Sequence, residues 1–154
     1  MRVLLQRIVA VLVIGGAPLT AGSSGSAVEM AEQEGFAGAW ITWWEDDGGF
    51  SECSRMDVVA EGETLLDGMW AAPGLNGVMH GAVARTADGL EWRGEWRDAR
   101  GTSGEFRFVL GAPGTPADRF EGTYTVEEGE TELTWNGVRL VEGDIPEAPC
   151  TFVG

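Results

Sequence analysis

The stretch Leu90-Glu91-Trp92-Arg93-Gly94-Glu95-Trp96-Arg97 decides the fold class of this chain. Apolar residues or glycine alternate strictly with charged residues, so one face of the segment is apolar and the other is charged. This period of two is typical of a half-buried antiparallel strand. The same alternation returns at residues 106–110 and 120–127. Because no convincing helical period occurs outside the N-terminal segment, the sequence predicts an all-β protein.

Turn residues separate these alternating segments along the chain. Asp88-Gly89, between two such segments, is the strongest signal for a two-residue hairpin. Short turns join neighbouring strands, and eight strands close readily into a barrel that is either filled or holds one small ligand. We therefore expect an eight-stranded antiparallel up-and-down (meander) β-barrel, with strands at residues 37–44, 53–60, 64–71, 77–86, 89–97, 104–110, 118–127 and 132–140.

A glycine lies at the centre of a repeated motif, in which an apolar residue and a second bulky residue flank it at a distance of two positions. Phe36-Ala37-Gly38-Ala39-Trp40 is the first copy, and Trp135-Asn136-Gly137-Val138-Arg139 is a variant at the end. The glycine and the bulky residues share one face of the strand. Mid-strand glycines let a sheet coil tightly and let aromatic rings lie over bare backbone. We assign this structural role to Gly38, Gly68, Gly81, Gly94, Gly122 and Gly137.

The first and last copies of this motif carry a family resemblance. Gly38-Ala39-Trp40 resembles the Gly-X-Trp opening of the calycins, the superfamily of lipocalins, fatty-acid-binding proteins and avidins. The resemblance implies that Arg139, near the last strand, packs over Trp40 and closes one end of the barrel. The glycine-centred strands are more similar to avidin, and still more similar to exported bacterial proteins that end in Trp-Asn-Gly-X-Arg. This resemblance implies a barrel architecture and does not identify a ligand.

The N-terminal segment has the three parts of a secretory signal peptide. Arg2 and Arg7 supply positive charge, an apolar core follows, and Gly25-Ser26-Ala27 provides small residues for cleavage. We expect a signal-peptide helix at residues 1–27, a leader at 28–35, the barrel at 36–140 and a tail at 141–154. An uncleaved anchor is the alternative. If the signal peptide is cleaved, we expect the mature protein to be secreted or periplasmic and not to insert into the membrane.

Cys53 and Cys150 are the only cysteines of the chain. Export places them in an oxidising compartment, where two cysteines pair readily. We therefore predict a Cys53–Cys150 disulfide that ties the tail to an early part of the domain. Two free thiols or an intermolecular bridge are the alternatives.

Charge and composition exclude several functions. The chain has 25 acidic and 10 basic residues, a net charge of −15, so it repels nucleic acids and anionic membranes. One histidine, His80, which we expect to face outward, leaves little material for a metal site or a nucleophile–histidine pair. The acidic residues 45–49 lack the spacing of a dedicated Ca²⁺ loop and are interpreted as a hairpin tip. We predict no catalytic residue, no metal, no cofactor and no enzymatic activity.

The aromatic residues on the inner face are the candidate binding residues. One hypothesis is an exported barrel that binds a small apolar or planar molecule. The alternative is a structural or protein-interaction module, similar to a protease inhibitor, with a filled core and no ligand. Adjacent Trp43 and Trp44 point to opposite faces, so we expect one of them to face outward or over the barrel mouth and to be exposed. The sequence leaves the oligomeric state open, and the candidate ligand-binding residues are Trp44, Trp70, Trp92, Trp96, Phe108 and Tyr124.

Overall fold

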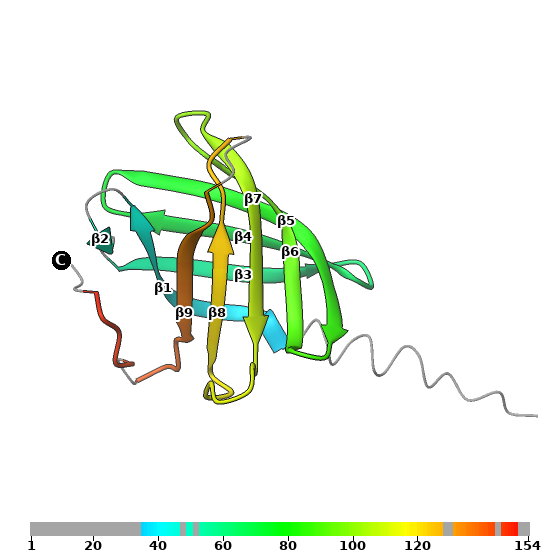
Figure 1. The fold of residues 1–154 in the computed structure, drawn as a ribbon. Coiled ribbons are helices and arrows are strands. Elements are labelled where there is room, and N and C mark those ends of the chain that lie inside the picture. Colours follow the sequence, from blue (N-terminus) through cyan, green and yellow to red (C-terminus); the bar gives the residue numbers. More distant parts are fainter. Residues whose placement is uncertain (1–34, 47–48, 51–52, 128–130, 144–145, 151–154) are drawn as a thin grey trace, which may run out of the picture.

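One antiparallel sheet makes up the fold (Figure 1). The computed structural model describes residues 35–46, 49–50, 53–127, 131–143 and 146–150. The expected signal peptide and nearly all of the leader lie outside the described residues. Nowhere in the described part is there an apolar helix of membrane-spanning length. The strands are β1 (Gly38–Asp46), β2 (Gly49–Phe50), β3 (Ser54–Glu61), β4 (Leu65–Ala72), β5 (Leu75–Thr86), β6 (Gly89–Asp98), β7 (Ser103–Leu110), β8 (Arg119–Tyr124) and β9 (Leu133–Arg139).

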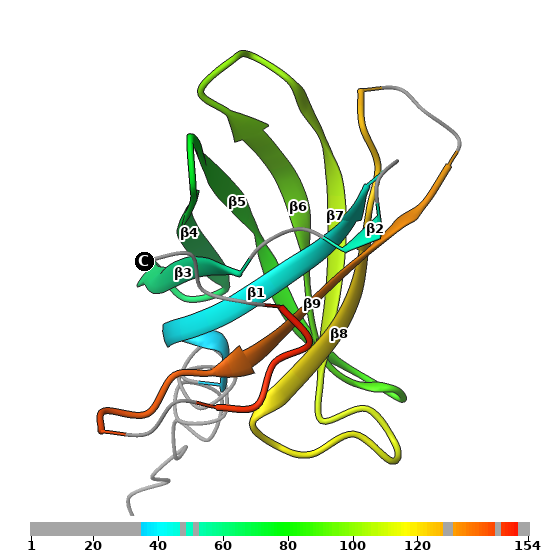
Figure 2. The same cartoon turned by 90° about the vertical axis from the view of Figure 1, so that its left-hand side faces the viewer.

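The sheet closes on itself as a barrel. Strands β3 to β9 follow one another in chain order, and β9 pairs with β1, so that Trp40 lies opposite Arg139 and Trp44 lies opposite Trp135. Figure 2 shows β1 and β9 side by side at this closure. The two-residue strand β2 only extends the outer end of β1. Without β2, the eight strands form the closed up-and-down barrel that the sequence predicts.

The observed strands differ from the predicted ones mainly at their ends. Strand β5 begins at Leu75, two residues before the predicted start, and pairs with β4 from there. The predicted strand 118–127 is too long, because β8 ends at Tyr124. Glu127 has a φ of 54°, a left-handed conformation that no regular strand continues through. The backbone N–H of Thr125 still donates to the carbonyl of Glu105, at 2.9 Å.

The barrel interior holds a single core of buried residues. On β6, Leu90, Trp92 and Trp96 are buried, as the alternation predicts. The outward residue Glu91 departs from the pattern, since it is 4% exposed. The whole interior cluster comprises Phe36, Trp40, Met56, Val58, Leu66, Trp70, Met79, Val83, Leu90, Trp92, Trp96, Phe106, Phe108, Leu110, Phe120, Tyr124 and Trp135.

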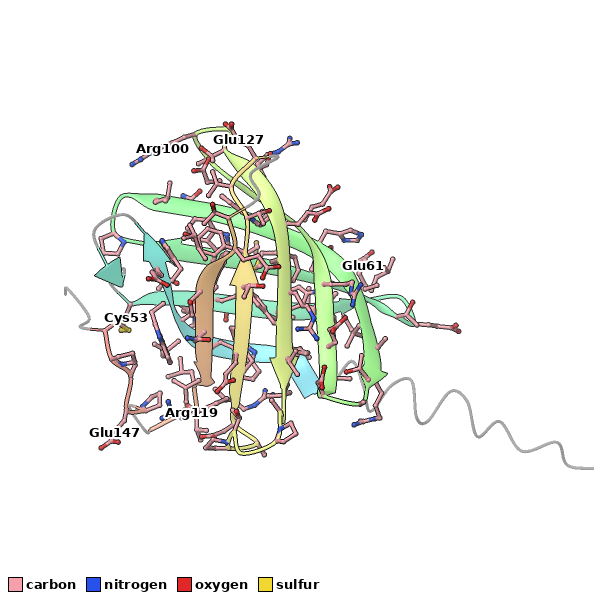
Figure 3. The ribbon with its side chains drawn as sticks, viewed as in Figure 1. Cys53, Glu61, Arg100, Arg119, Glu127 and Glu147 are labelled. Carbon is pink, nitrogen blue, oxygen red and sulfur yellow. A yellow bond between two sulfur atoms is a disulfide. The ribbon has the colours of Figure 1, made fainter. Side chains whose placement is uncertain are left out.

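The C-terminal tail covers part of the outer surface. The predicted disulfide is confirmed: Cys53 and Cys150 are bonded, with their Cα atoms 5.0 Å apart. Figure 3 shows the sulfur of Cys53 beside this tail. A second cluster, of Ile41, Trp43, Cys53 and Val138 with Leu140, Ala148 and Cys150, lies on this side. Trp43 and Trp44 point to opposite faces, as predicted, but the expected exposure of one of them is wrong. Trp43 belongs to this second cluster and is only 6% exposed, and Trp44 packs against the interior.

Candidate functional site

One end of the barrel is closed by an arginine and a tryptophan. The guanidinium carbon of Arg139 lies 4.3 Å from the ring centroid of Trp40. The same guanidinium donates hydrogen bonds to the carbonyls of Ala37, at 2.8 Å, and of Gly35. The indole N–H of Trp40 donates to the carbonyl of Phe36 at 2.7 Å. These bonds fold the segment before β1 across the barrel end.

Burial at this closed end affects the pKa of Arg139 without changing its charge at neutral pH. Burial lowers the pKa of Arg139, because the charged form loses water, and the carboxylate of Asp118 acts in the opposite direction. Arginine titrates so far above neutral pH that the group remains a cation. A cation over an indole face is stabilising when it is shielded from water.

Aromatic rings cover several of the repeated glycines. A Cβ atom at Gly122 would lie 2.4 Å from the ring of Phe108, and one at Gly137 would lie 2.2 Å from the ring of Phe120. At Gly68 the corresponding contact is 2.9 Å, to Trp92. The missing side chains therefore make room for the rings that fill the interior.

Two of the glycines instead face each other across neighbouring strands. Gly81 on β5 pairs directly with Gly94 on β6. A Cβ atom at Gly94 would lie 2.0 Å from the carbonyl oxygen of His80, which is backbone and cannot turn away. Gly38, at the start of β1, has a φ of 121°, which side-chain-bearing residues rarely adopt.

All six candidate ligand-binding residues belong to the interior core. Trp44 is half-buried and packs against the cluster, and the other five are buried. Their rings contact one another rather than an open space: ring centroids are 5.2 Å apart for Trp44 and Trp70, and 5.8 Å apart for both Trp92–Phe108 and Trp96–Tyr124. Their role in ligand binding remains a prediction.

Trp135 is the residue that joins these rings, and the ligand-binding set did not include it. Its ring lies within 6.5 Å, centroid to centroid, of five of the six: Trp44, Trp70, Trp96, Phe108 and Tyr124. Its position in the last glycine-centred motif was the available signal, because that motif places it on the inner face. Phe36 was also outside that set, although the first glycine-centred motif places it on the inner face, and it is fully buried in the core.

Within the described part of the chain, three buried indole N–H groups lack a hydrogen-bond partner. They belong to Trp70, Trp92 and Trp135. By contrast, the indole N–H of Trp96 donates to the carbonyl of Thr125 at 2.9 Å. A buried donor without a partner costs about 1–3 kcal/mol. Trp70 and Trp135 are nearly perpendicular, at 88°, an arrangement in which ring faces serve as weak acceptors.

Hydrogen bonds also tie down the end of the barrel opposite Arg139. The hydroxyl of Tyr124 donates to the carbonyl of Glu45 at 2.6 Å, and Thr134 donates to the Glu45 carboxylate at 3.1 Å. Glu45 belongs to the acidic stretch 45–49, of which residues 47–48 lie outside the described part. Among the described residues, no three His, Cys, Asp or Glu side chains gather to hold a metal ion.

On the outer face, Glu91 joins two arginines. Its carboxylate accepts hydrogen bonds from Arg107, at 2.7 Å, and from Arg93. Burial alone would raise the pKa of Glu91, but the hydrogen bonds from Arg93 and Arg107 outweigh it and lower the pKa below its usual value. His80 is exposed, as expected, and bonds to Asp67 on β4.

On the outer face, a hollow of about 500 Å³ lies over β6 to β8, with Arg93, Glu95, Glu105 and Arg107 in its walls. Two further open hollows adjoin each other. The larger, of about 1140 Å³, lies over β3 to β7 and the residues after β8. The smaller, of about 430 Å³, lies over β3 to β6 and the residues after β6. Both include Asp57, Met69, Val78 and Arg97 in their walls.

Comparisons with known proteins agree on the fold. No family model matches this chain, and no curated protein matches it. A de novo designed fluorescence-activating β-barrel is similar, with 14% identity and a TM-score of 0.52 over 70% of this chain and 96% of its own. A redesigned β-barrel has 16% identity and a TM-score of 0.54 over 71% and 96%. At this identity the likeness defines the class of protein as a small antiparallel β-barrel.

Proposed function

We propose that this chain is an exported binding protein without catalytic activity, a barrel with a solid aromatic core that recognises a partner protein through its outer surface. The observation that carries the proposal is the packing of the interior. The six candidate ligand-binding residues contact one another or Trp135, and rings occupy the space over the glycines. A filled barrel acts as a rigid support, so its binding surface lies outside.

Further observations support the finer parts of this proposal. The Cys53–Cys150 disulfide is typical of proteins in an oxidising compartment, which supports export. The contact of Arg139 with Trp40, together with the Gly38-Ala39-Trp40 opening, supports a calycin-like barrel. The residues that carry this resemblance close the barrel end and specify no ligand.

A second candidate function is the binding of a small planar molecule inside the barrel. It is favoured by the unpartnered indole N–H groups of Trp70, Trp92 and Trp135. A planar ligand with carbonyl or carboxylate oxygens would satisfy these donors. It would also have to displace rings that now contact one another, so we place this function second.

Tryptophan fluorescence distinguishes the two candidates. The protein is titrated with a flavin, a retinoid, a fatty acid and haem, while tryptophan emission and the melting temperature are followed. A filled core predicts no saturable change in emission and no rise in melting temperature. A saturable blue shift or quench together with a raised melting temperature would instead establish the interior site. Trp43→Phe is the matched control, since it removes a tryptophan that lies outside the barrel core.

A further inference from the structure

Exposed apolar side chains lie in the larger hollow on the outer face of the barrel. Met69 on β4 is 63% exposed and pairs directly with Val78 on β5, which is 55% exposed. Val59 on β3, 56% exposed, also lines this hollow. A concave group of exposed apolar side chains with polar surroundings marks a site of interaction. Methionine in particular adapts its shape to different partners.

Two uncompensated carboxylates lie beside these apolar residues. Glu95 on β6 is directly opposite Glu105 on β7, and like charges in this position repel each other. Neither takes part in an ion pair among the described residues. The neighbouring pair of like charges, Arg93 and Arg107, differs because Glu91 bridges it. Among the described residues no arginine bridges Glu95 and Glu105, so a cationic side chain of a partner has two carboxylates to bind there.

The remaining charges of the hollow are also mainly negative. Its walls include Asp57, Asp67 and Glu127 in addition to the two glutamates, against one arginine, Arg97. Asp57 is paired with Arg55, and Asp67 is paired with His80. Figure 3 shows Glu127 at the edge of the barrel, beside the β6–β7 hairpin. The field in the hollow therefore favours a positively charged occupant.

The spacing of the two features limits the shape of that occupant. Glu95 pairs with His80, which lies two residues beyond Val78 on β5. The apolar and acidic positions are therefore roughly 7 Å apart along the strands, at about 3.3 Å per residue. Alternate side chains of an extended peptide match this separation along the strands, and the long side chain of a lysine or arginine spans the offset of about 4.8 Å per strand across the sheet. An extended segment can thus place an apolar side chain on Val78 and a basic one at Glu95.

We propose that this hollow binds an extended, positively charged segment of a partner protein. Its apolar side chains pack on Met69 and Val78, and a lysine or arginine lies between Glu95 and Glu105. This inference rests on the proposed function, since it names the partner for the outer surface. A second copy of the chain does not fit, because both copies carry a net charge of −15.

The test uses a fluorescein-labelled peptide that repeats Leu-Ser-Lys-Ser and is followed by fluorescence anisotropy. In an extended chain this repeat presents leucine and lysine on one face. We expect saturable binding that weakens as salt is added. Glu95→Gln/Glu105→Gln should weaken it about two- to fivefold, as is expected for the loss of one exposed ion pair. Met69→Ser/Val78→Ser should weaken binding while leaving the salt dependence unchanged.

The control variant is Glu121→Gln/Glu147→Gln, which removes the same charge from exposed positions that do not line either hollow. It should bind the peptide as tightly as the unaltered protein. The proposal is overturned by absence of binding, by equal weakening in the control, or by equal affinity for a Ser-Ser-Lys-Ser repeat. Failure of the proposed function would give a different result, namely a saturable change in tryptophan emission when a planar ligand is added. All variants are first compared by thermal melting to establish that they fold.

Discussion

At the scale of single residues, Arg139 performs two tasks at the closed end of the barrel. Its guanidinium lies over Trp40 and also holds the carbonyls of Ala37 and Gly35. The planar group suits both tasks, because it stacks on an indole while donating hydrogen bonds from its edge. The chain before β1 is therefore fixed by a residue of the last strand.

Replacement of this arginine should loosen the barrel end. Arg139→Ala removes the cation over the indole and leaves two carbonyls without donors, so we expect a loss of about 2–4 kcal/mol in the free energy of unfolding. Urea denaturation followed by circular dichroism measures it. The free energy of unfolding of Arg139→Lys should lie between those of the wild type and Arg139→Ala, because lysine keeps the charge and loses the planar guanidinium group. A loss below about 0.5 kcal/mol in Arg139→Ala would contradict this role.

Gly94 on β6 lies opposite Gly81 on β5, where the two backbones are too close for a side chain. In Gly94→Val the new Cβ would meet the carbonyl oxygen of His80 at 2.0 Å. We expect destabilisation of about 3 kcal/mol, at the upper end of the usual range for overpacking, because backbone has to move. Ala82→Val is the control, since Ala82 is exposed on the outer face of the neighbouring strand. An unchanged melting temperature in Gly94→Val would show that the glycine is incidental.

At the scale of elements, the β6–β7 pair is joined on its outer face by charge. Glu91 is nearly buried and bridges Arg93 on its own strand to Arg107 on the next. Arg107 also reaches Asp88 at 3.5 Å, in the turn before β6. The pKa of Glu91 is lowered by these partners, so the bridge is pH-dependent.

The contribution of Glu91 should disappear in acid. Because its pKa is lower in the folded than in the unfolded chain, the stabilisation is complete above the unfolded value of about 4.3. It is lost as the pH falls through the lower, folded value. Urea midpoints of the wild type and Glu91→Gln should therefore differ most above about pH 4.3 and converge in more acidic solution. A difference independent of pH would exclude the ionised bridge, and Glu121→Gln controls for the loss of one charge.

The tail is a separate element that depends on its covalent link. The bond between Cys53 and Cys150 spans 97 residues, and the tail covers Trp43. Cys53→Ala/Cys150→Ala should lower the free energy of unfolding by about 2–4 kcal/mol, since a long loop is no longer closed in the unfolded chain. Tryptophan emission should also shift to the red as Trp43 meets water. Retention of both the stability and the emission maximum would contradict this role.

Most of the strands and turns could be predicted from the sequence. Residues 89–98 alternate so regularly that strand and facing follow directly, and Asp88-Gly89 marks the hairpin. The two-residue strand β2 gives no periodic signal, and the end of β8 depends on the backbone of Glu127. Whether the interior is filled or holds a pocket could not be predicted. Alternation shows which side chains face inward, but it does not show how the rings of Trp135 and its neighbours pack. The outer hollow depends on the curvature of the whole sheet.

At the scale of the whole molecule, a closed barrel with aromatic rings inside carries an excess of negative charge outside. The net charge of −15 opposes self-association and favours association with positively charged partners. The packed interior supports our proposal that recognition takes place on the outer surface. This proposal depends on the interior being closed to water.

Hydrogen–deuterium exchange of the indole N–H groups, followed by NMR, tests that claim most directly. The indoles of Trp70, Trp92 and Trp135 are buried and unpartnered, so they have no hydrogen bond to slow exchange and only exclusion from water protects them. A filled core predicts that these three exchange only when the whole domain unfolds, with a free energy equal to that from urea denaturation. Exchange within minutes, as in free tryptophan, would show that water enters the barrel and would contradict the account.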